Sequence, residues 1–263
     1  MVYRRKLDRF STLADIIARL RSPGGCPWDR QQTHLSLKPH LVEECYEVIE
    51  AMDHMDTARF SEELGDLLMQ IVLHAQIAAE QGDFEMADVL RAINTKLIRR
   101  HPHVFGPAKV DNAEQVIQNW EALKQEERQG ESVVSGLPKA MPALAYSQAI
   151  QQRAARSGFD WKQFGDVLDK LTEEVKEVKD VVDHEERVRE FGDVLFALAN
   201  CARWLHIDSE DALRMANERF SQRFRYMEQV CRQRGVVLSS LSLEEQDGLW
   251  EQAKENLSHA HPG

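Results

Sequence analysis

The residues best suited to chemistry are carboxylates, and their spacing groups them on successive helical segments. Glu43, Glu44 and Glu47 come first, and Glu63 and Asp66 follow further along the chain. At about 100° per residue, the three glutamates fall in one sector of a helix, while apolar residues cover the opposite side. Such a cluster offers oxygen ligands to a hard divalent cation. The alternative is a solvated face, because most charged residues are exposed.

A second copy of this pattern lies in the other half of the chain. Glu173, Glu174 and Glu177 are followed by Glu190 and Asp193 at similar spacing. Several elements repeated in the same order are the signature of a duplicated module. The repeat continues downstream with residues of similar type, namely Asn94, Lys96, Arg100, Trp120 and Lys124 in the first half and Asn217, Arg219, Arg223, Trp250 and Lys254 in the second.

The second acidic pair of each copy favours a metal site over a solvated face. Glu63 and Asp66 open an apolar run, as do Glu190 and Asp193, and such runs predict helices that enter a core. Buried carboxylates are costly unless they are paired, protonated or bound to a metal. Mg²⁺, with Mn²⁺ as a substitute, fits these ligands better than iron, because a di-iron carboxylate bundle carries a Glu-x-x-His motif that neither pair has.

The elements that must position these acids are helices. Apolar residues recur at helical spacing along most of the chain, and β-branched runs with period-two alternation are nearly absent, so the predicted fold class is all-α. Gly65 and Gly192 lie inside the acidic helices, which predicts that a neighbouring group approaches the backbone closely there. Glycines and prolines then interrupt the periodicity and predict two tandem modules, 1–128 and 140–263, joined by a linker over 129–139.

The charge balance argues against two classes of partner. The chain has 33 basic and 44 acidic residues, and its formal net charge of −11 disfavours non-specific binding to nucleic acid or to an anionic membrane. No apolar run approaches the ~20 residues of a membrane span, and the cysteines lack the spacing of a zinc site or a disulfide framework. We therefore expect a soluble, cytoplasmic protein. The sequence also contains neither a P-loop nor a G-x-G-x-x-G motif, which disfavours a P-loop NTPase and a dinucleotide-dependent oxidoreductase.

Both acidic copies match a known motif. The pattern E-E-x-x-E followed by E-x-x-D resembles that of the MazG family of all-α nucleoside triphosphate pyrophosphohydrolases, and the resemblance extends to Cys26-Pro27-Trp28-Asp29 and to residues 100–105. It implies Mg²⁺-dependent hydrolysis of a nucleoside triphosphate such as ATP between the α- and β-phosphates, giving the monophosphate and pyrophosphate. By position it implies as metal ligands Glu174, Glu177, Glu190 and Asp193 in the second copy, and Glu44, Glu47, Glu63 and Asp66 in the first.

The resemblance also implies roles for the remaining polar residues. Glu173 and its counterpart Glu43 are left to support the ligands or to orient and deprotonate the attacking water, so Glu173 joins Glu174 and Glu177 as a catalytic candidate. Trp250 either stacks on the base or ribose or anchors the last helix in the core. The cations that would hold the triphosphate are Lys170, Arg219, Arg223 and Lys254.

One difference between the copies indicates a division of labour. Lys170 lies three residues before Glu173, whereas the first copy has only Lys38, five residues before Glu43, so we expect the second copy to do most of the chemistry. The resemblance and the short helices of each module also predict a homodimer that completes a four-helix core. The alternatives are a nucleotide-sensing module with little turnover and a scaffold of amphipathic helices.

Overall fold

The computed structural model describes residues 6–113, 115–117, 119–120, 123 and 130–258. Every regular element in these ranges is a helix, which confirms the predicted all-α class. The chain forms two compact units, 1–127 and 128–263. The linker over 129–139 stays a prediction, and its first residue lies outside the described part. None of the described helices combines the length and apolar character needed to cross a membrane.

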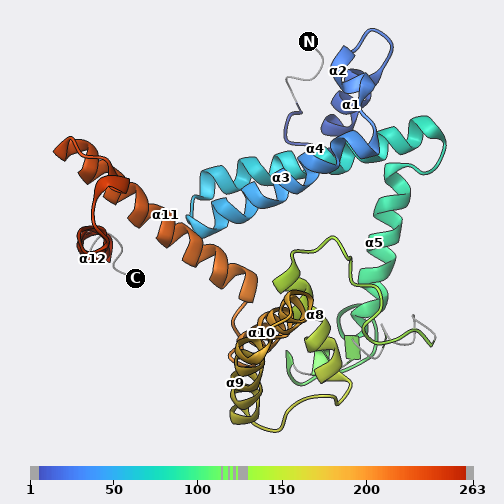
Figure 1. Ribbon diagram of the computed structural model, residues 1–263. Coiled ribbons are helices and arrows are strands. Elements are labelled where there is room, and N and C mark those ends of the chain that lie inside the picture. Colours follow the sequence, from blue (N-terminus) through green and yellow to red (C-terminus); the bar gives the residue numbers. More distant parts are fainter. Residues whose placement is uncertain (1–5, 114, 118, 121–122, 124–129, 259–263) are drawn as a thin grey trace. The chain divides into compact units, whose positions relative to one another are not determined.

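The first unit is built on a hairpin of two long helices, α3 (His34–Asp53) and α4 (Thr57–Gln81), which lie side by side (Figure 1). Thr33 begins α3 with a capping box, and the Asp56 carboxylate begins α4 by accepting a hydrogen bond from a backbone N–H of the first turn. These caps set where each helix starts and therefore the direction in which its acids point. The described part of the unit also contains α1 (Phe10–Arg21), α2 (Pro27–Gln31), α5 (Met86–Arg100) and α6 (Pro102–Phe105).

The core of the first unit lies where α1 crosses the hairpin. Ile17 from α1, Leu37 from α3 and Val72, Leu73 and Ile77 from α4 form one buried apolar cluster. Each is at most 4% exposed. Removal of this surface from water holds α1 against one face of the hairpin.

The second unit repeats this hairpin in α9 (Phe164–Asp180) and α10 (His184–Trp204). Asp183 caps α10 about two helical turns before Glu190, and the same distance separates Asp56, the cap of α4, from Glu63. The repeat predicted from sequence is thus a repeat of local geometry. The other elements are α8 (Ala143–Arg156), which packs on α10, α11 (Ser209–Arg234), a short 3₁₀ turn η2 (Leu238–Ser240) and α12 (Leu243–Ser258).

The last two helices pack on each other around a small core of their own. Met227 and Cys231 of α11 and Leu249 of α12 are buried together, and Trp250 covers them. Arg219 and Arg223 lie near the middle of α11, and Lys254 lies on α12. Their placement matters for the site described below.

Both acidic helices keep one face open in the single chain. Leu68 on α4 is 39% exposed and Leu195 on α10 is 41% exposed. A Cβ added at Gly65 or Gly192 would meet no atom of the chain within 4 Å. The expected close approach to these glycines is therefore wrong for the single chain. The reason is that a two-helix hairpin has two faces, and α1 or α8 covers only one of them.

Candidate functional site

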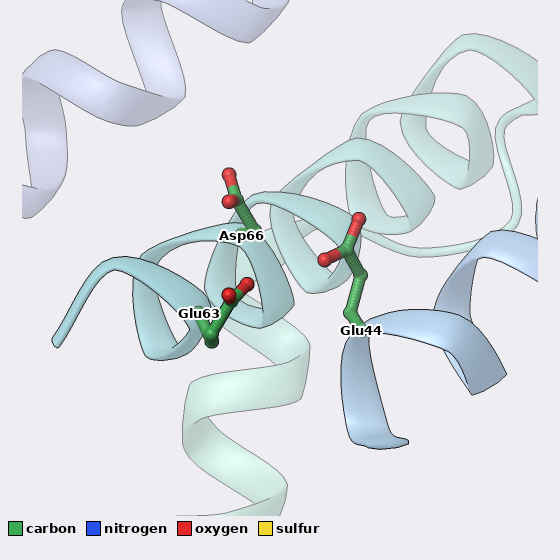
Figure 2. A group of neighbouring side chains, drawn as sticks. All are labelled: Glu44, Glu63 and Asp66. Carbon is green, nitrogen blue, oxygen red and sulfur yellow. The ribbon is translucent and has the colours of Figure 1, made fainter. Parts of the chain in front are cut away.

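In the first unit, Glu44 of α3 meets Glu63 and Asp66 of α4. One carboxylate oxygen from each lies within 4.8 Å of the others, and Figure 2 shows the three side chains rising from the two helices around a common space. Residues three apart on a helix share a face, so Glu63 and Asp66 both project toward α3. Three carboxylates this close could hold a divalent cation.

The first cluster is partly neutralised by neighbouring protein groups. The Arg59 guanidinium forms an ion pair with Glu63, with 3.1 Å between Nε and Oε1, and the Glu63 side chain is only 12% exposed. From α4, the Gln70 amide donates a hydrogen bond to Glu44 over 3.4 Å. Glu47 lies beside the cluster: burial first, and then repulsion from Glu63 and Glu44, raise the pKa of its carboxyl group. Glu43 is exposed and pairs with His40.

In the second unit, Glu174 and Glu177 of α9 meet Glu190 of α10 in the same way, with one oxygen of each within 4.8 Å of the others. Glu174 is buried, with 7% of its surface exposed. Burial first, and then repulsion from Glu174, raise the pKa of Glu177. A bound cation would relieve that repulsion, so the crowding itself fits a metal site.

Lys170 supplies the counter-charge of the second cluster. Its Nζ atom lies 2.7 Å from Glu174 and 3.1 Å from Glu173. These hydrogen bonds, the one to Glu174 foremost, raise the pKa of Lys170 well above its usual value. Glu173 is itself 57% exposed. The lysine singled out in the sequence therefore lies directly beside the predicted metal ligands.

A cavity of about 500 Å³ adjoins this second cluster. Lys170, Glu174 and Asp193 are part of its wall, so Asp193 lies outside the group of three acids but lines the same cavity as Glu174. The metal-binding roles of Asp193 and Glu47 stay predictions. The rest of the wall is largely apolar and aromatic, with a few polar groups: Val134, Ile150, Gln151, Ala154, Phe159, Asp160, Trp161, Val167, Phe196, Ala197, Asn200 and Arg203.

The remaining predicted substrate residues lie on α11 and α12, which pack on each other and not extensively on α9, the helix of Lys170. The Arg223 guanidinium sits over the Trp250 ring, 5.6 Å from its centroid, and Lys254 pairs with Glu251 over 2.6 Å. Arg219 is exposed on α11. All four belong to α11 and α12, whereas Lys170 belongs to α9. The first unit repeats the ring contact, with Arg100 over Trp120 at 5.4 Å.

Five residues of these sites were not identified from the sequence. Arg59 could have been identified from the sequence, because it lies four residues before Glu63 on the same helix face. The sequence indicates Asn200 only weakly, as a polar residue within the apolar stretch of α10. No sequence pattern identifies Gln70, Asp160 or Arg203, because their roles depend on partners from distant segments.

These features define a class of protein: an all-α chain with a duplicated acidic helical hairpin suited to a divalent cation. The model of the MazG nucleotide pyrophosphohydrolase domain matches residues 32–105 and 163–227, one segment for each hairpin. The chain therefore belongs to the MazG nucleotide pyrophosphohydrolase family.

Relatives match over nearly the whole chain. A Thermotoga maritima protein named nucleoside triphosphate pyrophosphohydrolase/pyrophosphatase MazG is 47% identical over 247 residues, 93% of this chain and 95% of the relative. The nucleoside triphosphate pyrophosphohydrolase of Escherichia coli K12 is 42% identical over 257 residues, 94% of this chain and 98% of the relative. The uncharacterized protein YabN of Bacillus subtilis is 47% identical over 252 residues, 94% of this chain and 52% of the relative.

Proposed function

We propose that this chain is a Mg²⁺-dependent nucleoside triphosphate pyrophosphohydrolase that releases pyrophosphate and a nucleoside monophosphate. The observation that carries the proposal is the acidic cluster of Glu174, Glu177 and Glu190, which adjoins a ligand-sized cavity with Lys170 at the junction. The names of the Thermotoga maritima and Escherichia coli relatives support the same reaction. A nucleotide substrate also favours a cytoplasmic location.

The donor set fits Mg²⁺, with Mn²⁺ as a substitute, because it consists of carboxylate oxygens alone. Glu174, Glu177 and Glu190 would hold the ion, with Asp193 as a fourth ligand on the cavity side. When bound, the cation supplies positive charge that activates water and offsets negative charge on the phosphoryl oxygens. Without it, the acids would repel a triphosphate.

The protein's own groups then orient the reactants. Lys170 Nζ is shared between Glu173 and Glu174, so a cation on Glu174 frees it to bind a phosphate oxygen. Glu173 is exposed next to the cluster and can accept the proton of the attacking water at Oε2, since Oε1 faces Lys170. Both residues act from the same turn of α9, which keeps the proton acceptor close to the phosphate-binding cation.

We assign the chemistry mainly to the second unit. In the first, Arg59 already compensates Glu63, and Gln70 occupies a hydrogen-bonding position of Glu44. The position equivalent to Gln70 in the second unit is Ala197, which lines the cavity. A small side chain leaves room for a ligand there, whereas the glutamine reaches into the acidic cluster.

We further propose a homodimer. The hairpins expose apolar residues and the two helix glycines on one face, which a second copy would cover. The predicted triphosphate cations of α11 and α12 form a group separate from Lys170, and a partner's α11 and α12 could bring them to the acids. A dimer would thus complete both the four-helix core and the site.

A turnover panel tests this function directly. Purified protein is incubated with canonical and damaged nucleoside triphosphates and Mg²⁺, in the absence of added pyrophosphatase, and the products are separated. We expect monophosphate and pyrophosphate in equal amounts, loss of activity in excess EDTA and recovery with Mg²⁺ or Mn²⁺. Orthophosphate with a diphosphate would refute the cleavage position, and binding without turnover would support the nucleotide-sensing alternative.

A further inference from the structure

We propose that the cavity between α8, α9 and α10 is the nucleobase subsite, and that Asn200 donates a hydrogen bond to the edge of the base there and sets base preference. This inference rests on the proposed pyrophosphohydrolase function. Apart from the acids and Lys170 in its wall, the residues that argue for this subsite lie on α8, on the part of α10 beyond Asp193 and on the segment before α9.

The position of the cavity follows from the bond that is cleaved. Hydrolysis between the α- and β-phosphates requires the catalytic groups at the α-phosphate, and only one ester oxygen separates that phosphate from the ribose. The nucleoside must therefore occupy space directly next to the acids. The cavity has Lys170, Glu174 and Asp193 in its wall, and its volume of about 500 Å³ lies within the range of about 300–1,000 Å³ for small-molecule sites.

The lining suits a flat aromatic ligand. Trp161 and Phe196 both line the cavity and are 43% and 45% exposed, so their rings present apolar surface to it. Ala154 and Ala197 also line it, and their short side chains leave room between the helices. Bases stack readily on such aromatic side chains whatever their identity. Stacking explains binding, but discrimination between bases needs a fixed polar group.

Asn200 is such a group, because an ion pair from a distant segment fixes its amide. The Arg203 guanidinium is 8% exposed and pairs with Asp160, with 3.0 Å between Nη1 and Oδ2. Asp160 also accepts hydrogen bonds from the Trp204 indole and the Trp161 backbone. Arg203 Nε then donates to Asn200 Oδ1 over 2.9 Å. With its oxygen occupied, Asn200 offers its NH₂ group as a donor to a ring nitrogen or carbonyl oxygen of the base.

An acceptor accompanies this donor. The Gln151 amide on α8 donates from Nε2 to the backbone carbonyl of Phe196 over 3.0 Å, and Gln151 lines the same cavity. Its Oε1 atom can therefore accept from an exocyclic amine. A donor and an acceptor whose orientations are set by protein contacts can distinguish the hydrogen-bonding edge of one base from that of another.

The first unit has apolar residues at the positions that correspond to Asn200 and Trp204. Asn200 and Trp204 correspond to Leu73 and Ile77, which are 4% and 1% exposed in the apolar cluster beneath α1. The same helix pair thus packs well with leucine and isoleucine at these positions. Packing does not require the asparagine, so its presence beside a cavity points to a ligand.

The test replaces Asn200 by the residue of the first copy and measures base preference. For Asn200→Leu and wild type, kcat and KM are determined with ATP, GTP, CTP and UTP in Mg²⁺, with pyrophosphate as the readout. We expect kcat/KM for the preferred nucleotide to fall at least tenfold, mainly through KM, and the four values to converge. Asn200→Asp, which replaces the donor by an acceptor, should change their order.

Two further variants separate a subsite from a purely structural role. Ala197→Gln installs the first unit's side chain in the cavity and should raise KM for all four nucleotides. Asn94→Leu makes the same exchange at an exposed position of α5 and should leave the profile unchanged. Unaltered base ratios in folded Asn200→Leu and Asn200→Asp would overturn the subsite.

The outcome also distinguishes the two proposals. If wild-type protein releases no pyrophosphate from any nucleotide, the proposed function fails. Calorimetric titration with the four nucleoside monophosphates then tests the cavity by itself. Binding that Asn200→Leu weakens would support the subsite, and absence of binding to wild type would refute it.

Discussion

The two neighbouring carboxylates Glu174 and Glu177 should respond in opposite ways when each is changed to glutamine in the metal-free protein. Glutamine preserves side-chain size and removes the charge. The Glu174 side chain is 9% exposed and forms a 2.7 Å ion pair with Lys170. Glu177 is exposed, and the repulsion that helps to raise its pKa disappears with its charge. Glu174→Gln should therefore destabilise the metal-free fold, and Glu177→Gln should stabilise it.

The size of the Glu174 effect follows from the burial of the pair. Exposed ion pairs contribute up to about 1 kcal/mol, and breaking a fully buried pair costs about 3–5 kcal/mol. Lys170 is 37% exposed and keeps Glu173 as a partner, so we expect the free energy of unfolding to fall by about 1 kcal/mol, the value for an exposed pair. A loss of about 1 kcal/mol lowers Tm by roughly 2–4 °C for a domain of ordinary size. Differential scanning calorimetry in EDTA measures both shifts, and a higher Tm for Glu174→Gln would refute the stabilising role of the pair.

Both variants should nevertheless lose activity to a similar extent. Each removes a ligand charge from the proposed Mg²⁺ site, and we expect kcat/KM to fall at least 100-fold, or about 2.7 kcal/mol of transition-state stabilisation. The matched changes Glu44→Gln and Glu47→Gln in the first unit serve as controls and should cost much less. If the first-unit pair is the more damaging, with circular dichroism showing folded protein, the assignment of the chemistry to the second unit is wrong.

Three further predictions concern pH, the first unit and assembly. Because the folded-state pKa of Glu177 is raised, its charge destabilises the metal-free fold increasingly as pH rises from the ordinary value of 4.5 through the raised pKa. The Tm advantage of Glu177→Gln in EDTA should accordingly vanish at low pH and grow to a plateau; an advantage that is constant with pH would contradict this. Arg59→Gln removes the cation beside Glu63 and, in a Glu174→Gln background, should tighten Mn²⁺ binding about tenfold, as measured by electron paramagnetic resonance. Unchanged affinity would show that Arg59 does not limit the first site. Leu195→Glu places a charge on the open apolar face of α10 and should reduce the mass from light scattering from twice 30.2 kDa to 30.2 kDa, whereas a monomeric wild type would refute the homodimer.

Much of the fold was predictable because it depends on local spacing. Helical periodicity identified an all-α chain, and aspartate caps stand at equal distances before Glu63 and Glu190. The i,i+3 and i,i+4 rules place acids on one helix face whatever surrounds the helix. The sequence therefore predicted three carboxylates of each copy that the structure brings together, Glu44, Glu63 and Asp66 in the first and Glu174, Glu177 and Glu190 in the second. The fourth expected ligand of each copy, Glu47 or Asp193, lies outside these groups. The family resemblance followed from the same spacing.

The sequence by itself thus determined the helices, the duplication and the acidic faces, whereas tertiary structure decided what each face meets. Asp160 reaches Arg203 only because α8 and the segment before α9 pack on α10, and this contact orients Asn200 beside the cavity. The two copies share their acids, yet one packs leucine where the other leaves a ligand-sized space. Contacts between distant segments depend on the shapes and volumes of several helices together, and no local periodicity encodes them.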